Sequence, residues 1–134
     1  MTFVQHPNFL RVVLFVDAAT CVATGALLAA GAGWLAAWTQ LPAELLRYAG
    51  ISLFPIAAFI LLVASRARPP AAGVWLVIIG NVGWVLASLG LLAMEGIAPN
   101  GLGYGFVIAQ AAAVALLAEL EFMGLSRWAR AQVA

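Results

Sequence analysis

The sequence predicts an all-α protein, a membrane-spanning four-helix bundle with the N and C termini in the cytoplasm. Three observations support this fold class: an apolar composition, four apolar segments long enough to cross a bilayer, and an uneven distribution of arginine. Of the 134 residues, 66% are hydrophobic and only 8% are charged, whereas a soluble domain has roughly 25% charged residues. So few charged side chains cannot cover the apolar surface of a small soluble fold. We therefore expect lipid to surround this surface.

Four segments have the length that a membrane-spanning helix needs, which is about 20 mostly apolar residues for about 30 Å of hydrocarbon. We expect them in one transmembrane domain that comprises residues 1–134, with spans at about residues 10–32, 43–64, 74–93 and 102–123. The segment "GAG" at residues 31–33 should end the first helix, and Pro42 suits the first turn of the second. The outer loops, residues 34–42 and 94–103, are too short for a soluble domain, and we expect at most an interfacial turn in each.

Arginine placement predicts the orientation of the chain. With four spans, one side of the membrane carries five of the six basic residues: Arg11, Arg66, Arg68, Arg127 and Arg130. Only Arg47 lies on the other side, and loops rich in arginine stay in the cytoplasm. Trp34 and Trp38 would mark the outer interface, where tryptophan is enriched. We therefore expect a multi-pass protein of a bacterial inner membrane.

Asp17 is the only acid deep within an apolar segment of the first span. An ionisable side chain in hydrocarbon is costly unless it has a partner, so Asp17 should face other helices. Thr20, Cys21 and Thr24 follow at helical spacing and form one weakly polar stripe with it. On the third span, Asn81 lies at a similar depth, because both residues are roughly 9–10 Å from the cytoplasmic ends of their spans by the helical rise. We therefore expect Asp17 and Asn81 to be able to meet.

A second polar layer is expected nearer the outer face. Ser52, Ser88 and Gln110, on the second, third and fourth spans, each lie roughly 8–12 Å from the outer ends. Glu121 lies eleven residues after Gln110 and so returns to the same helix face, at the inner boundary, whereas Glu119 points to the opposite side. Together, the candidate polar core or ion site comprises Asp17, Thr20, Thr24, Asn81, Ser88 and Gln110.

Small residues recur at four-residue spacing on three spans, a pattern that lets helices approach closely in lipid. The predicted helix-packing residues are Gly25, Ala29, Gly33, Gly83, Ala87, Gly105 and Ala109. Some of these faces should pack within the bundle. One of them is left to associate outside it, so a homo-oligomer or a larger membrane complex is expected.

Several functional classes are excluded or disfavoured by the sequence. The net charge of +1 gives no basic surface for nucleic acid. His6 is the only histidine and Cys21 the only cysteine, so neither haem ligation by a histidine pair nor a zinc site is expected, and no metal or cofactor is predicted. No nucleophile has a base beside it, and no enzymatic activity is predicted.

The segments "LPAELLRYAG", "VWLVIIGNVGWVLAS" and "PNGLGYGFVIAQAAAVALLAELEFMGL" resemble those of a type of short four-span bacterial membrane protein. This resemblance covers nearly the whole chain and implies an architecture, not an activity. The chain differs from the small multidrug exporters, which also carry a single acid in their first span, because theirs is a glutamate in another surrounding pattern.

Three roles remain for Asp17: a structural hydrogen bond or ion pair with Asn81, Arg11 or Arg66, a proton or cation site, or a contact with a partner subunit. The preferred hypothesis is a non-enzymatic accessory or scaffold subunit that packs laterally with itself or with other membrane proteins. The alternative is a small proton-coupled transporter or ion carrier in which Asp17 is the exchanging carboxylate. A buried polar cavity around Asp17 that is open to water on one side would favour transport, and a dry core with a flat apolar flank that meets another chain would favour the accessory role.

Overall fold

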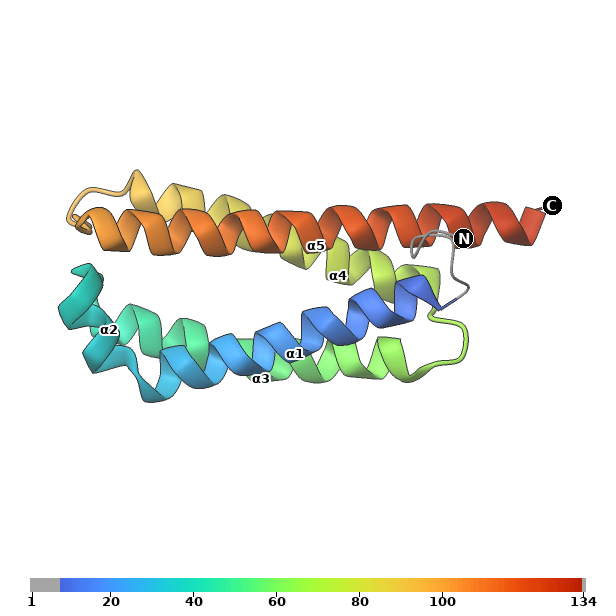
Figure 1. Ribbon diagram of the computed structural model, residues 1–134, viewed down its shortest axis with the longest axis horizontal. Helices are drawn as coiled ribbons and strands as arrows, with labels where there is room; N and C mark the ends of the chain where they lie inside the picture. Colours follow the sequence, from blue (N-terminus) through green and yellow to red (C-terminus); the bar gives the residue numbers. More distant parts are fainter. Residues whose placement is uncertain (1–7, 134) are drawn as a thin grey trace.

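The computed structural model describes residues 8–133, and this part of the chain is helical, with no β-strand (Figure 1). Its helices, in chain order, are α1 (Phe9–Ala30), α2 (Ala32–Thr39), α3 (Ala43–Ser65), α4 (Ala71–Leu92) and α5 (Gly101–Val133). Four helical segments are long and apolar enough to cross a membrane: α1, α3, α4 and Gly101–Arg127 of α5. The predicted all-α, four-span architecture is thereby confirmed.

The first outer loop differs from the interfacial turn that was expected. Gly31 ends α1, but its backbone remains near the helical region (φ −101°, ψ 13°), and the helix resumes at once as α2. Alanine and leucine favour a helix there, and α2 ends only at Gln40, in the left-handed conformation (φ 62°). Trp34 and Trp38 lie on its exposed face, with ring centroids 5.8 Å apart.

The last helix extends ten residues past the predicted end of the fourth span, because α5 continues from residue 123 to Val133. Its 33 residues span about 50 Å at the helical rise, which exceeds the hydrocarbon thickness of about 30 Å. Its C-terminal end extends beyond the other helices, on the side of the molecule where α1 begins (Figure 1). Arg127 and Arg130 were expected to follow the end of the fourth span, but the helix continues past both of them.

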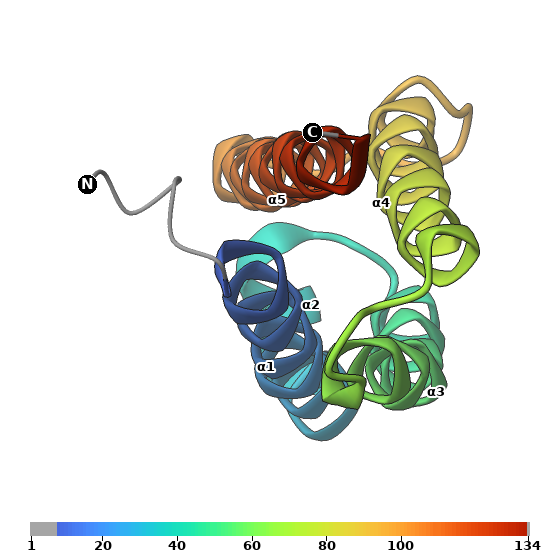
Figure 2. The ribbon, with the colours of Figure 1, turned by 90° about the vertical axis from the view of Figure 1, so that its right-hand side faces the viewer.

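The helices pack as two pairs, α1 with α3 and α4 with α5, and α1 also contacts α5 (Figure 2). Although α3 and α4 are consecutive, they contact each other only sparsely. An apolar cluster at the end where α1 begins joins all four long helices through Leu14, Ile60, Val74 and Leu125. At the opposite end, Asn100 ties α5 to α2: its backbone N–H bonds the Thr39 carbonyl, and its side-chain amide donates to the Trp38 carbonyl.

Glycine permits a close crossing between α1 and α3. A Cβ at Gly25 would lie 2.9 Å from the Gly50 carbonyl oxygen, and a Cβ at Gly50 would lie 2.6 Å from the Ala29 backbone nitrogen. Of the predicted packing residues, Gly25 and Ala29 lie at this crossing. Gly50, which supplies the other side of the crossing, was not among the predicted packing residues.

The other predicted packing residues do not pack between helices of this bundle. Gly33, Gly83 and Gly105 have open space around them, and Ala87 and Ala109 are exposed. On α4, the buried side instead carries Val74, Val77, Ile78 and Asn81. These side chains are larger than glycine and alanine, so α4 does not approach its neighbours as closely as α1 approaches α3.

Candidate functional site

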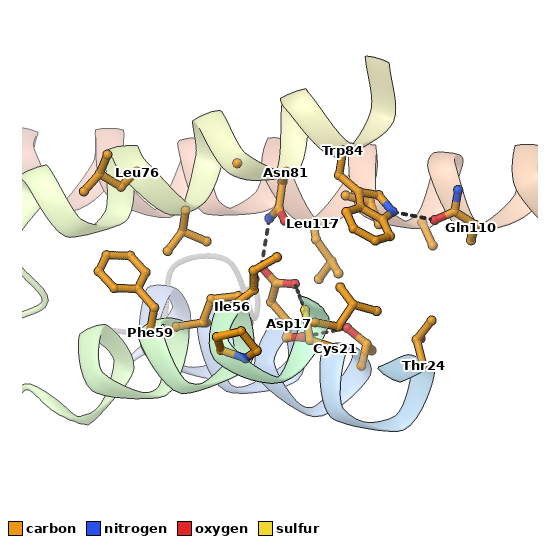
Figure 3. A pocket seen from close by; sticks show the side chains of 18 residues that line it. Asp17, Cys21, Thr24, Ile56, Phe59, Leu76, Asn81, Trp84, Gln110 and Leu117 are labelled. Atoms are coloured by element: carbon orange, nitrogen blue, oxygen red, sulfur yellow. Dashed lines mark hydrogen bonds between the residues drawn. The ribbon is translucent and has the colours of Figure 1, made fainter. Parts of the chain in front are cut away.

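Three polar side chains from three helices meet in the interior of the bundle. Asp17 of α1, Asn81 of α4 and Glu121 of α5 are 2%, 7% and 0% exposed. The amide nitrogen of Asn81 donates to Asp17 Oδ2 over 2.8 Å and to Glu121 Oε2 over 3.1 Å. One amide group therefore holds two carboxyl groups together, and Figure 3 shows its side chain reaching from α4 towards Asp17.

The contact between Asp17 and Asn81 agrees with their similar depth in the sequence, whereas Glu121 was expected at the inner membrane boundary. Because α5 continues well beyond Glu121, this residue lies within the bundle. The Oε1 atom of Glu121 is buried and has no hydrogen-bond partner among the described residues. The spacing of eleven residues from Gln110 was the signal that Glu121 faces inward, since eleven residues make about three helical turns.

Asp17 receives one further contact, from its own helix. The thiol of Cys21 lies 3.8 Å from Asp17 Oδ1 and donates to it. The hydroxyl of Thr20 bonds the Asp17 backbone carbonyl and so does not reach the carboxylate. Arg11, one of the ion-pair partners considered for Asp17, instead donates from Nε to the carbonyl of Ala64 at the end of α3.

The outer polar layer contains Trp84, Ser88 and Gln110 but not Ser52. The Trp84 indole donates to Gln110 Oε1, and Gln110 Nε2 donates to Ser88 Oγ, both over 2.9 Å. These bonds join α4 to α5. Ser52 is exposed, and its hydroxyl bonds the Ala49 carbonyl of its own helix. A serine in a helix can satisfy itself in this way, so similar depth did not bring Ser52 into the layer.

A cavity of about 410 Å³ lies beside the buried cluster, between the α1–α3 pair and the α4–α5 pair. Asp17, Thr20, Thr24 and Asn81 line it together with many apolar side chains, and Gln110 lies at its edge with Trp84 (Figure 3). A second cavity, of about 200 Å³, shares Thr24, Trp84 and Gln110 with the first and also includes Ser88 in its lining. The structure thus brings five of the six candidate site residues to the first cavity, and Ser88 to the second.

The chemistry available at this site is that of acids in an apolar surrounding. Within residues 8–133, no group of three or more His, Cys, Asp or Glu side chains is placed to hold a metal ion. His6 lies outside the described residues. The two carboxyl groups can exchange protons and can attract a cation, but they do not form a set of ligands for a metal ion.

Comparisons with known proteins give no relative from which a function could be transferred: no protein family, no curated protein and no solved structure matches the chain. The functional argument therefore depends on the geometry of the cluster and of the cavity.

Proposed function

We propose that this chain is a small proton-coupled transporter or ion carrier in which Asp17 is the exchanging carboxylate. The observation that supports this proposal is the position of Asp17: it is buried inside a membrane-spanning bundle, next to a second acid, and it lines a cavity. The cavity beside Asp17 supports transport over a scaffold role, since a scaffold needs no cavity at its buried acid; most of the residues that line this cavity are apolar.

The environment of Asp17 favours exchange of a single proton. Glu121 of α5 shares the Asn81 amide with Asp17, and Cys21 of α1 donates its S–H to it. From α3, the residues that line the cavity beside Asp17 are all apolar: Leu53, Pro55, Ile56, Phe59 and Ile60. Two negative charges side by side in a medium of low dielectric constant repel each other strongly. A proton held by the pair relieves this repulsion, and a cation that binds at Asp17 can take its place.

Two measurements on protein reconstituted in liposomes test the proposal. Infrared spectroscopy should detect the C=O stretch of a protonated carboxyl group, which should change with pH and lose intensity in Asp17→Asn. A proton flux driven by a potassium diffusion potential, read with a pH dye inside the vesicles, should depend on Asp17. Glu119→Gln is the matched control, because Glu119 is an exposed acid two residues from Glu121. Equal band and flux in the parent protein and in Asp17→Asn would refute the proposal.

The accessory or scaffold role is a second candidate, favoured by the unfilled small-residue surface of α5. Gly105 and Ala109 lie one turn apart, are exposed and contact no other helix closely, which leaves room for a helix of another chain. Under this proposal, crosslinking in nanodiscs should give a defined oligomer or a stoichiometric partner. Gly105→Leu should abolish it, while Leu102→Ala, at another exposed position of α5, should not. A monomer under these conditions would exclude homo-oligomerisation, and failure to recover a partner from native membranes would exclude the complex.

Under both candidates, we place the protein in a bacterial inner membrane with its termini in the cytoplasm. Support for this orientation comes from the arginines at positions 66 and 68, which lie together in the short connection between α3 and α4.

A further inference from the structure

The cavity beside Asp17 is bordered by side chains that also form the surface of the bundle. Ile56 and Phe59 of α3 are each 39% exposed, and Leu76 of α4 is 59% exposed. Figure 3 shows Phe59 and Leu76 on the two helices that border the cavity. Because α3 and α4 contact each other only sparsely, a molecule dissolved in the bilayer can reach the cavity between them.

The hydrogen-bonding groups of the cavity wall have an uneven balance between donors and acceptors. Asn81 has two amide hydrogens, which bond Asp17 and Glu121. Gln110 also has two, which bond Ser88 and the Val107 carbonyl, and the single indole hydrogen of Trp84 bonds Gln110. Since these side chains have no further N–H groups, every N–H donor of the wall is already used.

The acceptors of the wall are not used up in the same way. A carboxylate offers about four lone-pair positions, and Asp17 receives one amide donor on Oδ2 and a weak thiol donor on Oδ1. A ligand at this wall therefore finds acceptors and a negative group. A phosphate at this wall would meet a carboxyl group and no free N–H donor, whereas an N–H group of a cation can be accepted; the hydroxyl of Thr24 is a further donor of the wall.

The rest of the wall is suited to a hydrophobic body. Leu53, Ile60, Val77 and Leu117 provide aliphatic surface, and Phe59 and Trp84 provide aromatic rings, which attract cations over their faces. A volume of about 410 Å³ is within the range of roughly 300–1,000 Å³ of small-molecule sites.

We propose that the cavity binds a hydrophobic ammonium ion, that is, a protonated amine with at least one N–H and an aromatic or aliphatic body. The amine enters from the bilayer between α3 and α4 and donates its N–H to Asp17. This assignment deepens the proposed transport function and rests on it, since the ammonium ion takes the place of the proton, which is released to water.

Direct binding to protein in nanodiscs tests the substrate class. The probe is dansylcadaverine, a primary amine on a fluorescent body, read by energy transfer from tryptophan and corrected with empty nanodiscs. The same dansyl body with an uncharged alkyl chain is the neutral comparison. The amine should bind at least 10-fold more tightly than the neutral compound, release a proton on binding, and lose at least 10-fold affinity in Asp17→Asn but not in Glu119→Gln.

A second variant tests amine binding in the cavity without changing Asp17. Gly80 lines the cavity and has open space where a Cβ would be, so Gly80→Leu should fold normally and fill the entrance. Gly83→Leu is its matched control, because Gly83 also has open space but does not line the cavity. Gly80→Leu should reduce amine binding at least 10-fold, and Gly83→Leu should leave it unchanged.

The outcomes separate the two proposals. Equal binding of the amine and the neutral compound, or equal binding to the parent protein and Asp17→Asn, overturns the ammonium assignment. If the infrared band and the proton flux still depend on Asp17 in that case, the transport function stands with another substrate. If neither depends on Asp17, both proposals fail.

Discussion

Gly25 of α1 and Gly50 of α3 lie directly against each other where their helices cross, so a Cβ on either residue would come within 3 Å of the other's carbonyl oxygen. At Gly50, the backbone nitrogen of Ala29 and the Cβ of Leu28 are closer still. Backbone atoms cannot turn aside as the end of a flexible side chain can. A side chain at this crossing must therefore push α1 and α3 apart.

We predict that Gly50→Ala lowers the free energy of unfolding by about 1–3 kcal/mol, the usual cost of overpacking an interface. Thermal unfolding in detergent, followed by circular dichroism, measures the effect. Gly83→Ala is the control, because nothing lies within 4 Å of a Cβ there and alanine favours a helix more than glycine does. Equal stability of the two variants would contradict the tight crossing.

Asn81→Leu should destabilise the bundle at its centre. Leucine has the same branched arrangement of side-chain heavy atoms but cannot donate, so the carboxyl oxygens of Asp17 and Glu121 that now accept from Asn81 lose their donor. A buried polar group left without a partner costs about 1–3 kcal/mol, and we expect a loss of that order in unfolding by denaturant in mixed micelles. Ser52→Ala should have almost no effect, because the Ser52 hydroxyl is exposed and bonds only its own helix. An Asn81→Leu variant as stable as Ser52→Ala would show that the amide does not hold the cluster together.

The Trp84–Gln110 bond should contribute little to stability but should couple the two residues. Interhelical hydrogen bonds in membranes average about 0.6 kcal/mol and reach about 1.7 kcal/mol. In a double-mutant cycle of Trp84→Phe and Gln110→Leu, we expect a coupling energy of about 0.5–1.5 kcal/mol. Pairing Trp84→Phe with Ser52→Ala should give no coupling. A zero coupling for the first pair would show that the Trp84–Gln110 bond does not contribute to the packing of α4 against α5.

The spans and the meeting of Asp17 with Asn81 could be predicted from the sequence, because each depends on one physical requirement. Hydrocarbon requires long apolar helices, and a polar group inside them requires a partner at the same depth. Asp17 and Asn81 are deep in their segments, so few other partners were available to either.

Glu121 and the cavity could not be predicted in the same way. The arginines that follow Glu121 indicated the end of the membrane span. The sequence has no helix-breaking proline there, so it did not show where the helix itself ends. The cavity depends on how far α3 lies from α4, which is set by contacts of α3 with α1 and of α4 with α5. Such a distance is a property of the assembled bundle and not of any one segment.

The orientation of the bundle can be tested by cysteine labelling, with Cys21 replaced by alanine. We expect Glu95→Cys, in the connection between α4 and α5, to react with a membrane-impermeant maleimide added to intact spheroplasts. Arg68→Cys, in the connection between α3 and α4, should react only after lysis. Both positions are exposed, so a difference in labelling reports the side of the membrane and not burial. Labelling of Arg68→Cys from outside would show that the topology is the reverse of the one proposed. The arginine-rich end of the bundle, with the C-terminal extension of α5, would then lie outside the cytoplasm.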